Sequence, residues 1–410
     1  MSTAESSVYD WTAPGVFVNP HPLLHEMRMR TPVYFDPTLE AWVLTRYRDV
    51  RQALQDPRFG RVEQFKRFAA LPEVDQEALA PLRRVFPVWG GQGEPPEDHR
   101  LFVDLLRPVL LSPQAKGSED REPVALIPAM RPRMEATLDR LLEAVLKRER
   151  FDMVGDVARP FAMQAIADLL GVPTTGHMEM LLRCARVVPG MFEQGTRGQL
   201  YSCQECVLEL RDYVEPIVAA HHTQRQADLI SLFLEAGEAH FDHDYVVAQT
   251  VLLLVVGSYP PGNLLASGLQ LLFEYPEQRA KLRADPSLIG NAIDEMVRFS
   301  PPVPPFSTRE LAKEDVSIGN QLIHRGESVV VVLGAANRDP DVFHDPDQFD
   351  VSRKNVHRHM GFGIAPHACL GREFVHTAGE VFFPTILERL PDLRPIDAEP
   401  DWVPFRPFGR

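Results

Sequence analysis

One stretch near the C-terminus, residues 360–371, constrains the fold of this chain more than any other; it reads MGFGIAPHACLG. Its glycines and proline disfavour regular structure, so the backbone can lie close against a flat surface. Cys369 lies in this loop, just before an amphipathic run from Arg372 to Leu390 that predicts a helix. Free N–H groups at a helix N-terminus lower the pKa of a thiol, and such a thiolate suits a soft metal ion. Taken alone, the pattern fits a buried structural cysteine better than a metal ligand.

The loop also resembles the haem-binding loop of the cytochromes P-450, which has the pattern Phe-Gly-x-x-x-His-x-Cys-x-Gly. This chain has Phe362, His367 and Cys369 at the corresponding positions, with Ile364 and Ala365 as mild departures. The resemblance implies that the Cys369 thiolate is the axial ligand of a haem iron.

Composition excludes several classes of protein. The chain has 410 residues, 44% of them hydrophobic, and no linker or repeat interrupts it, which favours one domain spanning residues 1–410. The net charge of −14 argues against nucleic acid or an anionic membrane as a partner. The longest apolar run, Val251 to Val256, is too short to span a bilayer, and the N-terminus has no signal-peptide pattern. We therefore expect a cytoplasmic, monomeric protein.

The N-terminal segments predict a helix at Pro20–Arg30, a strand at Ala41–Thr45 and a helix at Tyr47–Gln55. Residues 82–97 are rich in proline and predict a long irregular loop. The resemblance implies that this loop roofs the substrate pocket.

The segment after this loop bears on haem binding. The family has Pro-Pro-Glu-His-x-Arg-Leu-Arg here, and its His and second Arg face the haem propionates. In this chain Asp98 takes the His position, unless the register slips by one to His99, and Phe102 takes the Arg position. Buried carboxylates need cationic or hydrogen-bonding partners, so His99 and Arg100 are the local candidates. The resemblance assigns four further residues to haem binding: Arg309, His359, Phe362 and His367.

The most apolar predicted helix runs from Tyr245 to Phe273. The family carries an acid and an alcohol in this helix that guide protons during oxygen activation. The corresponding catalytic segment here is Gly257, Ser258, Tyr259 and Pro260, with Tyr259 at the acid position and Pro260 at the alcohol position. The prolines and glycines predict a break in the helix, interpreted as a gap beside the iron or as a plain kink.

Further helices are predicted at 123–149 and 160–170, and the resemblance makes Met178–Val188 and Gln199–Gln224 the substrate-covering helices. Cys203 and Cys206 lie one turn apart in the second covering helix. Zinc needs four ligands and no second cysteine pair exists, so we interpret them as ordinary helix residues.

The helix Ile289–Phe299 carries Glu295 and Arg298, which can pair because they are three residues apart. In the family this pair is a structural clamp for the loop before the cysteine. The family positions also give a substrate pocket of Val256, Gly257, Val303 and Phe306.

The resemblance implies a mainly α protein with small β-sheets, the single triangular P-450 domain, with haem between the long central helix and the cysteine-bearing helix. It also suggests a shortened C-terminal hairpin. The implied function is monooxygenation in secondary metabolism, using haem b and O2. The substrate is a mostly apolar small molecule, and the reaction is a hydroxylation, dealkylation, epoxidation or oxidative coupling. The alternatives are a peroxide-driven peroxygenase and a haem protein that binds or senses without turnover.

Electrons must come from a separate ferredoxin- or flavodoxin-type protein, because the chain carries no flavin or iron–sulfur module. A cluster of cations beside the haem loop predicts its docking face, with a solvated basic loop as the alternative. This cluster consists of Arg353, Lys354, His357, Arg358 and Arg372.

Without the acid and alcohol, protons reach the site through ordered water, through a polar group of the substrate, or not at all if peroxide is the oxidant. We favour water, held by the carbonyls that Pro260 and Pro261 leave without a helical donor.

Overall fold

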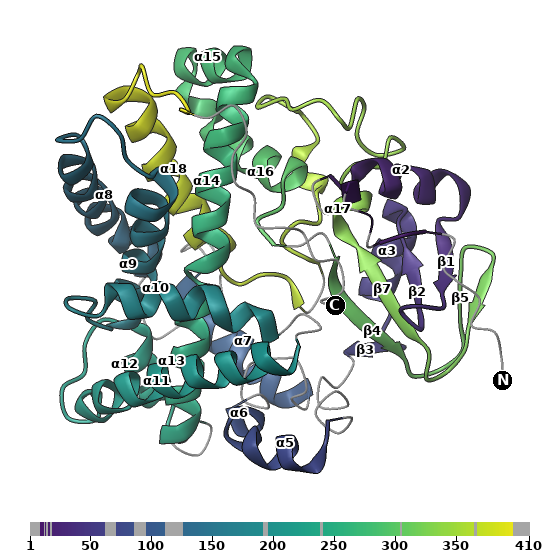
Figure 1. The fold of residues 1–410 in the computed structure, drawn as a ribbon, viewed down its shortest axis with the longest axis horizontal. Coiled ribbons are helices and arrows are strands. Elements are labelled where there is room, and N and C mark those ends of the chain that lie inside the picture. The colour runs from purple at the N-terminus through teal and green to yellow at the C-terminus, as the bar shows by residue number, and fades with distance from the viewer. Residues whose placement is uncertain are drawn as a thin grey trace. The chain divides into compact units, whose positions relative to one another are not determined.

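The computed structural model describes residues 9–11, 13, 15–16, 19–61, 71–85, 96–110, 126–191, 196–237, 241–303, 306–364 and 367–396. These residues form many helices and two small β-sheets, which confirms the predicted fold class (Figure 1). The chain divides into two compact units. Unit 1 comprises residues 1–62, 267–369 and 391–410, and unit 2 comprises residues 63–266 and 370–390.

Unit 1 is built on a five-stranded sheet with the strand order β1-β2-β7-β4-β3. Strands β2 and β7 pair in parallel and the other neighbours are antiparallel. The strands are β1 (Val33–Asp36), β2 (Ala41–Leu44), β3 (Phe59–Arg61), β4 (Phe306–Ala312) and β7 (Ser328–Val332). A separate hairpin pairs β5 (Val316–Ile318) with β6 (Gln321–Ile323).

The central strand β7 explains the core of unit 1. It is a run of valines, a residue favoured in strands, and successive side chains point to opposite faces. Val329 and Val331 join the hydrophobic cluster that includes α3 (Tyr47–Gln55). Val330 and Val332 join the cluster that includes α2 (His21–Arg30). The sheet is therefore covered on both faces.

The rest of unit 1 consists of short helices and turns around α16 (Ile289–Phe299), which is buried from Ala292 to Phe299. The remaining helices of this unit are α15 (Pro276–Ala284), η4 (Pro286–Leu288), α17 (Leu333–Ala336) and η5 (Val356–Arg358).

Unit 2 is helical within its described residues, and α9 (Arg159–Leu170) forms its centre. Nine of the 12 residues of α9 are buried, and it contacts α8, α10 and α13. The other helices are α5 (Glu73–Ala78), α6 (Ala80–Val85), α7 (Pro96–Leu110), α8 (Leu126–Val145), η2 (Met153–Ala158), α10 (Met178–Val187), η3 (Val188–Met191), α11 (Arg197–His221), α12 (Leu229–Ala236), α13 (His243–Val256) and α18 (Arg372–Arg389). Helix α14 (Tyr259–Glu274) begins in unit 2 and ends in unit 1.

The predicted break in the apolar helix is confirmed, because α13 ends at Val256 and α14 begins at Tyr259. Among the described helices, the stretch His243–Glu274 is long and apolar enough to cross a bilayer. Buried residues make up 61% of its most apolar window, as in the core helix of a soluble protein. The predicted loop at 82–97 is wrong at both ends, because α6 continues to Val85 and α7 already includes residues 96 and 97. The next described residue is Pro96, the first residue of α7.

Candidate functional site

The loop that carries Cys369 is closed by its own backbone. The Cys369 N–H donates to the Phe362 carbonyl at 2.7 Å, and the Gly363 N–H donates to the Met360 carbonyl at 2.9 Å. Gly363 has φ +68°, a left-handed conformation that favours glycine. Cys369 itself is exposed, so the alternative of a buried structural cysteine is wrong. The thiol therefore stands exposed at the end of this loop.

His359 supports this loop from behind. The Gly361 N–H donates to His359 Nδ1 at 3.1 Å, so the proton of the neutral ring lies on Nε2, which contacts Asp294 Oδ1 at 3.2 Å. Gly361 lies so close to α16 that a Cβ there would overlap the Val297 side chain. These contacts fix the entrance of the loop against α16. The role of His359 toward haem stays a prediction.

The predicted Glu295–Arg298 ion pair is present and fully buried. Arg298 Nε and Nη2 donate to the two carboxylate oxygens of Glu295 at 2.6 and 2.7 Å. Arg298 also donates to backbone carbonyls, at 3.0 Å to Asn337 and 2.8 Å to Pro346. The Asn337 side chain in turn accepts from the Met360 N–H at 2.7 Å. The pair therefore fixes the backbone that leads into the cysteine loop.

Arg353 also belongs to this network. Its predicted place on an exposed docking face is therefore wrong. Its side chain is only 8% exposed, and its Nε lies 3.1 Å from both oxygens of Glu295. Its other donors reach the carbonyls of His344, Asp345 and Gln348. A buried guanidinium needs a counter-charge and hydrogen-bond acceptors. Arg353 can be buried because the Glu295 carboxylate, 58 residues earlier in the chain, supplies the counter-charge.

The other predicted docking cations divide between the units. Lys354, His357 and Arg358 are exposed in unit 1, whereas Arg372 is half-buried and opens α18 in unit 2.

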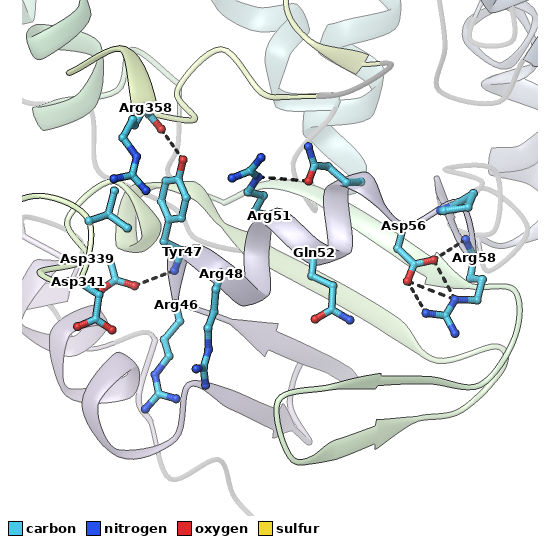
Figure 2. A pocket seen from close by; sticks show the side chains of 13 residues that line it. Arg46, Tyr47, Arg48, Arg51, Gln52, Asp56, Arg58, Asp339, Asp341 and Arg358 are labelled. Carbon is cyan, nitrogen blue, oxygen red and sulfur yellow. Dashed lines mark hydrogen bonds and ion pairs between the residues drawn. The ribbon is translucent and has the colours of Figure 1, made fainter. Parts of the chain in front are cut away.

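Arg358 borders an open groove of about 830 Å³ on unit 1 that runs along α3 (Figure 2). The Tyr47 hydroxyl donates to the Arg358 carbonyl at 2.8 Å, and the Tyr47 N–H donates to Asp339 Oδ2 at 2.8 Å. The Arg358 guanidinium lies 5.7 Å from the centre of the Tyr47 ring. The groove is lined by Arg46, Tyr47, Arg48, Arg51, Gln52, Gln55, Asp56, Pro57, Arg58, Asp339, Asp341, Val342 and Arg358.

We call Arg46, Arg51 and Arg358 the groove arginines, because within the described residues none of the three forms an ion pair with a carboxylate. Arg58, in contrast, is paired with Asp56, and its pKa is raised by that hydrogen bond. Figure 2 shows Arg46 on one side of α3 and Arg51 on the other. The sequence reasoning missed Arg46 and Arg51, although closely spaced arginines in a chain of net charge −14 are a signal.

The break between α13 and α14 forms a compact turn in unit 2. The Gly257 N–H donates to the Leu253 carbonyl at 2.8 Å, and the buried Ser258 hydroxyl donates to the Leu254 carbonyl at 2.6 Å. Pro260 and Pro261 fall in the first turn of α14, where helical N–H groups have no intrahelical acceptor, so prolines are tolerated. The break precedes the prolines for this reason.

The residues of this segment have different surroundings. A Cβ on Gly257 would overlap the Ile166 side chain of α9, so glycine permits close packing of the helices there. The side chain of Val256 is 40% exposed, while Tyr259 and Pro260 are half-buried. The catalytic role of the segment stays a prediction.

The candidate haem-binding residues are only partly described. Arg100 and His367 are exposed, and the Phe362 ring lies 5.6 Å from the His359 ring. Phe102 is buried and stacks on Phe233 at 5.9 Å, so this position belongs to the core of unit 2. Three predicted residues have side chains outside the described part: His99, Phe306 and Arg309. Val303 is half-buried.

The chain is similar to known proteins over most of its length. Residues 140–391 match the family model for cytochrome P450. The chain is 31% identical to cytochrome P450 107B1 of Saccharopolyspora erythraea over 90% of this chain and 86% of that protein. It is also 31% identical to 6-deoxyerythronolide B hydroxylase of the same organism, over 90% and 87% of the two chains.

Among solved structures, the chain is similar to P450BioI in complex with an acyl carrier protein ligated to hexadec-9Z-enoic acid. The TM-score is 0.81 at 27% identity, covering 93% of this chain and 94% of that one. A second similar structure is epothilone B-bound cytochrome P450epoK, with a TM-score of 0.80 at 26% identity over 94% and 93% of the chains.

Proposed function

Because the chain belongs to the cytochrome P450 family of haem monooxygenases, we propose that it holds haem b through the Cys369 thiolate and oxidises a mostly apolar small molecule. The observation that carries the proposal is the exposed Cys369 thiol at the end of a closed loop. When bound, haem supplies the oxidation of the substrate with O2 and two electrons. The residues of this chain hold the group, position the substrate and manage water and protons.

The donor set around Cys369 fits a flat group that binds through one soft ligand. Gly361 packs its bare backbone against Val297 of α16, Gly363 takes the left-handed conformation that closes the loop, and the carbonyl of Phe362 accepts the Cys369 N–H. The network of Glu295, Arg298 and Arg353 keeps the preceding backbone rigid. In the proposal, haem propionates take cationic partners from Arg100, Arg309, His99 and His367.

The proposed electron donor is an acidic protein of ferredoxin or flavodoxin type that docks on the groove arginines. Arg46, Arg51 and Arg358 form no ion pair within the described residues, and arginines outnumber aspartates in the groove lining, which would steer an acidic partner to this surface on a chain of net charge −14. The Tyr47 hydroxyl ties α3 to Arg358, two residues before Met360 and the cysteine loop. The docking surface and the thiolate loop therefore share one scaffold.

The proposed proton path uses ordered water at the turn between α13 and α14. Residues 260 and 261 have no N–H, so the carbonyls of Val256 and Gly257 receive no helical donor from them. Ser258 already donates its hydroxyl proton to Leu254, and Tyr259 offers only a weakly acidic phenol. Two carbonyl acceptors are left for water.

The proposed substrate class draws on relatives whose names state what they act on or hold. One is a hydroxylase of 6-deoxyerythronolide B, and solved neighbours hold epothilone B and myristic acid. In the proposal, Val256 and Val303 contact such a substrate, consistent with the partial exposure of Val256. A peroxide-driven peroxygenase is the alternative, favoured by the absence of an acid and an alcohol at positions 259 and 260.

Thiolate ligation is tested by spectroscopy. The reduced protein with carbon monoxide should show the red-shifted Soret band of thiolate-ligated haem, and Cys369→His should abolish this band while haem is retained. Cys203→Ser is the matched control, because Cys203 is a buried thiol of α11 and should leave the band unchanged. An unaltered band in the Cys369→His variant would overturn the assignment.

A further inference from the structure

Two histidine side chains meet on the surface of unit 2, where the end of α11 approaches the start of α13. His222 follows the last residue of α11, and His243 is the first residue of α13. His222 Nε2 lies 3.2 Å from His243 Nδ1, and the two ring centres are 5.4 Å apart with an interplanar angle of 30°. We call these two residues the histidine pair.

The separation of the two nitrogens is one that a single metal ion can bridge. Zinc binds histidine nitrogen at about 2.0 to 2.1 Å, so two imidazoles on one ion stand about 2.9 Å apart at a right angle and about 3.3 to 3.4 Å apart at the tetrahedral angle. The observed 3.2 Å falls between these limits. The two helices therefore already hold the nitrogens at the required separation, and only the rings have to turn so that both lone pairs face the ion.

The rings are free to make this turn, because His222 is exposed and His243 is half-buried. Without a metal ion, the contact between the two nitrogens is a hydrogen bond that needs one proton between them. An ion takes the place of that proton. The ring that loses it takes up a proton from water on its other nitrogen and stays neutral, which is the form that binds metal.

The carboxylates next to His243 in the chain are already engaged. Asp242 accepts from the Tyr245 N–H at 2.7 Å and so caps α13. Asp244 accepts from Arg211 Nη2 at 3.1 Å. Within the part of the chain that the structure describes, no third histidine, cysteine or carboxylate joins the pair in a ligand cluster. The two imidazoles are therefore the protein ligands, and water completes the coordination.

The neighbouring His221 provides a contrast. It is buried, with its Nδ1 2.7 Å from the Ile217 carbonyl and its Nε2 2.9 Å from Asp228 Oδ2. Both of its ring nitrogens are occupied by oxygen atoms of the protein, so it offers no lone pair to an ion. At this junction of α11 with the following segment, His222 is the histidine that solvent ions can reach.

We propose that the histidine pair is a binding site for a divalent transition-metal ion, Zn²⁺ or Cu²⁺, that bridges α11 and α13. Imidazole is a preferred ligand for both ions. Structural zinc sites use four protein ligands, so a site with two is weaker and exchanges its ion with solution. The two histidines lie 21 residues apart in the chain, on either side of α12, so a bound ion closes this segment into a loop and stabilises the folded state. The site uses none of the residues assigned to haem.

The test titrates Zn²⁺ into untagged, full-length holoprotein that has been freed of loose metal with EDTA, using isothermal titration calorimetry. The wild type should bind one ion at the pair, and Mg²⁺ should not compete because it prefers oxygen ligands. His222→Ala and His243→Ala should each weaken this binding by at least about tenfold, since losing even an outer partner of a metal ligand costs that much. His344→Ala is the matched control, because His344 is exposed and pairs with Asp345 rather than with a second histidine. It should bind Zn²⁺ as the wild type does.

Thermal unfolding tests whether the ion bridges the two helices in the folded state. The Tm of the wild type and of His344→Ala should rise with Zn²⁺ concentration, whereas the Tm of His222→Ala should not. A wild type that binds no Zn²⁺, or whose Tm does not rise with it, would overturn the proposal. So would wild-type affinity in His222→Ala or in His243→Ala, and each variant decides this alone because each removes one of the two ligands.

Discussion

The network of Glu295, Arg298 and Arg353 allows a stability prediction whose size follows from the structure. The Glu295 carboxylate has no exposed surface and accepts from both guanidiniums and from the Asp350 N–H. The other hydrogen-bond acceptors of the two arginines are backbone carbonyls. Glu295→Gln keeps the shape of the side chain but leaves both arginines without this counter-charge.

Removing one member of a buried ion pair costs about 3 to 5 kcal/mol, because an uncompensated charge stays behind. A typical protein is stable by only about 5 to 15 kcal/mol, so the substitution should remove a large part of the stability. We expect a much lower urea midpoint for Glu295→Gln and loss of haem during purification. The control Arg30→Gln, which breaks an ion pair exposed on α2, should leave the midpoint unchanged.

A double-mutant cycle tests whether Glu295 neutralises Arg353 as well as Arg298. Arg353→Met alone removes a cation from Glu295, but combined with Glu295→Gln it removes one of the two uncompensated charges. The double variant should therefore lose less stability than the sum of the single variants. A wild-type midpoint for Glu295→Gln, or strict additivity in the cycle, would refute the view that this carboxylate neutralises two buried cations.

Two further predictions concern surface charge and pH. Arg51→Glu with Arg358→Glu should slow reduction by an acidic ferredoxin and flatten its salt dependence in stopped-flow measurements. Unchanged kinetics at low salt would exclude the groove. His21 has a pKa lowered to about 3 by burial and by Arg338, below the unfolded value near 6.5. The unfolded state therefore binds the proton first, and stability is lost as pH falls from 6.5 toward 3, by at most about 1.4 kcal/mol per pH unit. His21→Gln should reduce this loss between pH 7 and pH 5 in urea unfolding; an equal loss would contradict it.

What the sequence predicts well here is local. The Glu295–Arg298 pair follows from helical spacing, and the helix break follows from prolines that lack an N–H. The sequence predicts Arg353 on an exposed docking face because it clusters with other cations beside the haem loop, yet its partner Glu295 lies 58 residues earlier in the chain and meets it only through tertiary packing. The groove on α3 was missed for the same reason, since Arg358 joins α3 through the Tyr47 hydroxyl. Residue spacing and backbone chemistry can be read from neighbouring positions in the sequence. These contacts form only when segments far apart in the chain pack together, so the sequence does not predict them.

The turn at Gly257–Pro261 allows a final test, because the carbonyls that its prolines leave without a helical donor are the atoms proposed to hold the water of the proton path. If water is held by the Val256 and Gly257 carbonyls, restoring an amide at position 260 should withdraw the first of these acceptors from water. The double variant Tyr259→Glu, Pro260→Thr supplies an acid and an alcohol but also returns this amide.

We expect the coupling of NADPH consumption to product to fall several-fold in the double variant. Pro261→Ala is the matched control for the backbone alone: it returns an amide toward Gly257 without adding a hydroxyl or a carboxylate, and it should lower coupling as well. If coupling instead rises in the double variant, the native turn is only a weaker version of the acid and alcohol pair. If neither variant changes coupling or the peroxide-driven rate, the carbonyls hold no functional water, and the turn serves only to let α13 and α14 pack closely against α9.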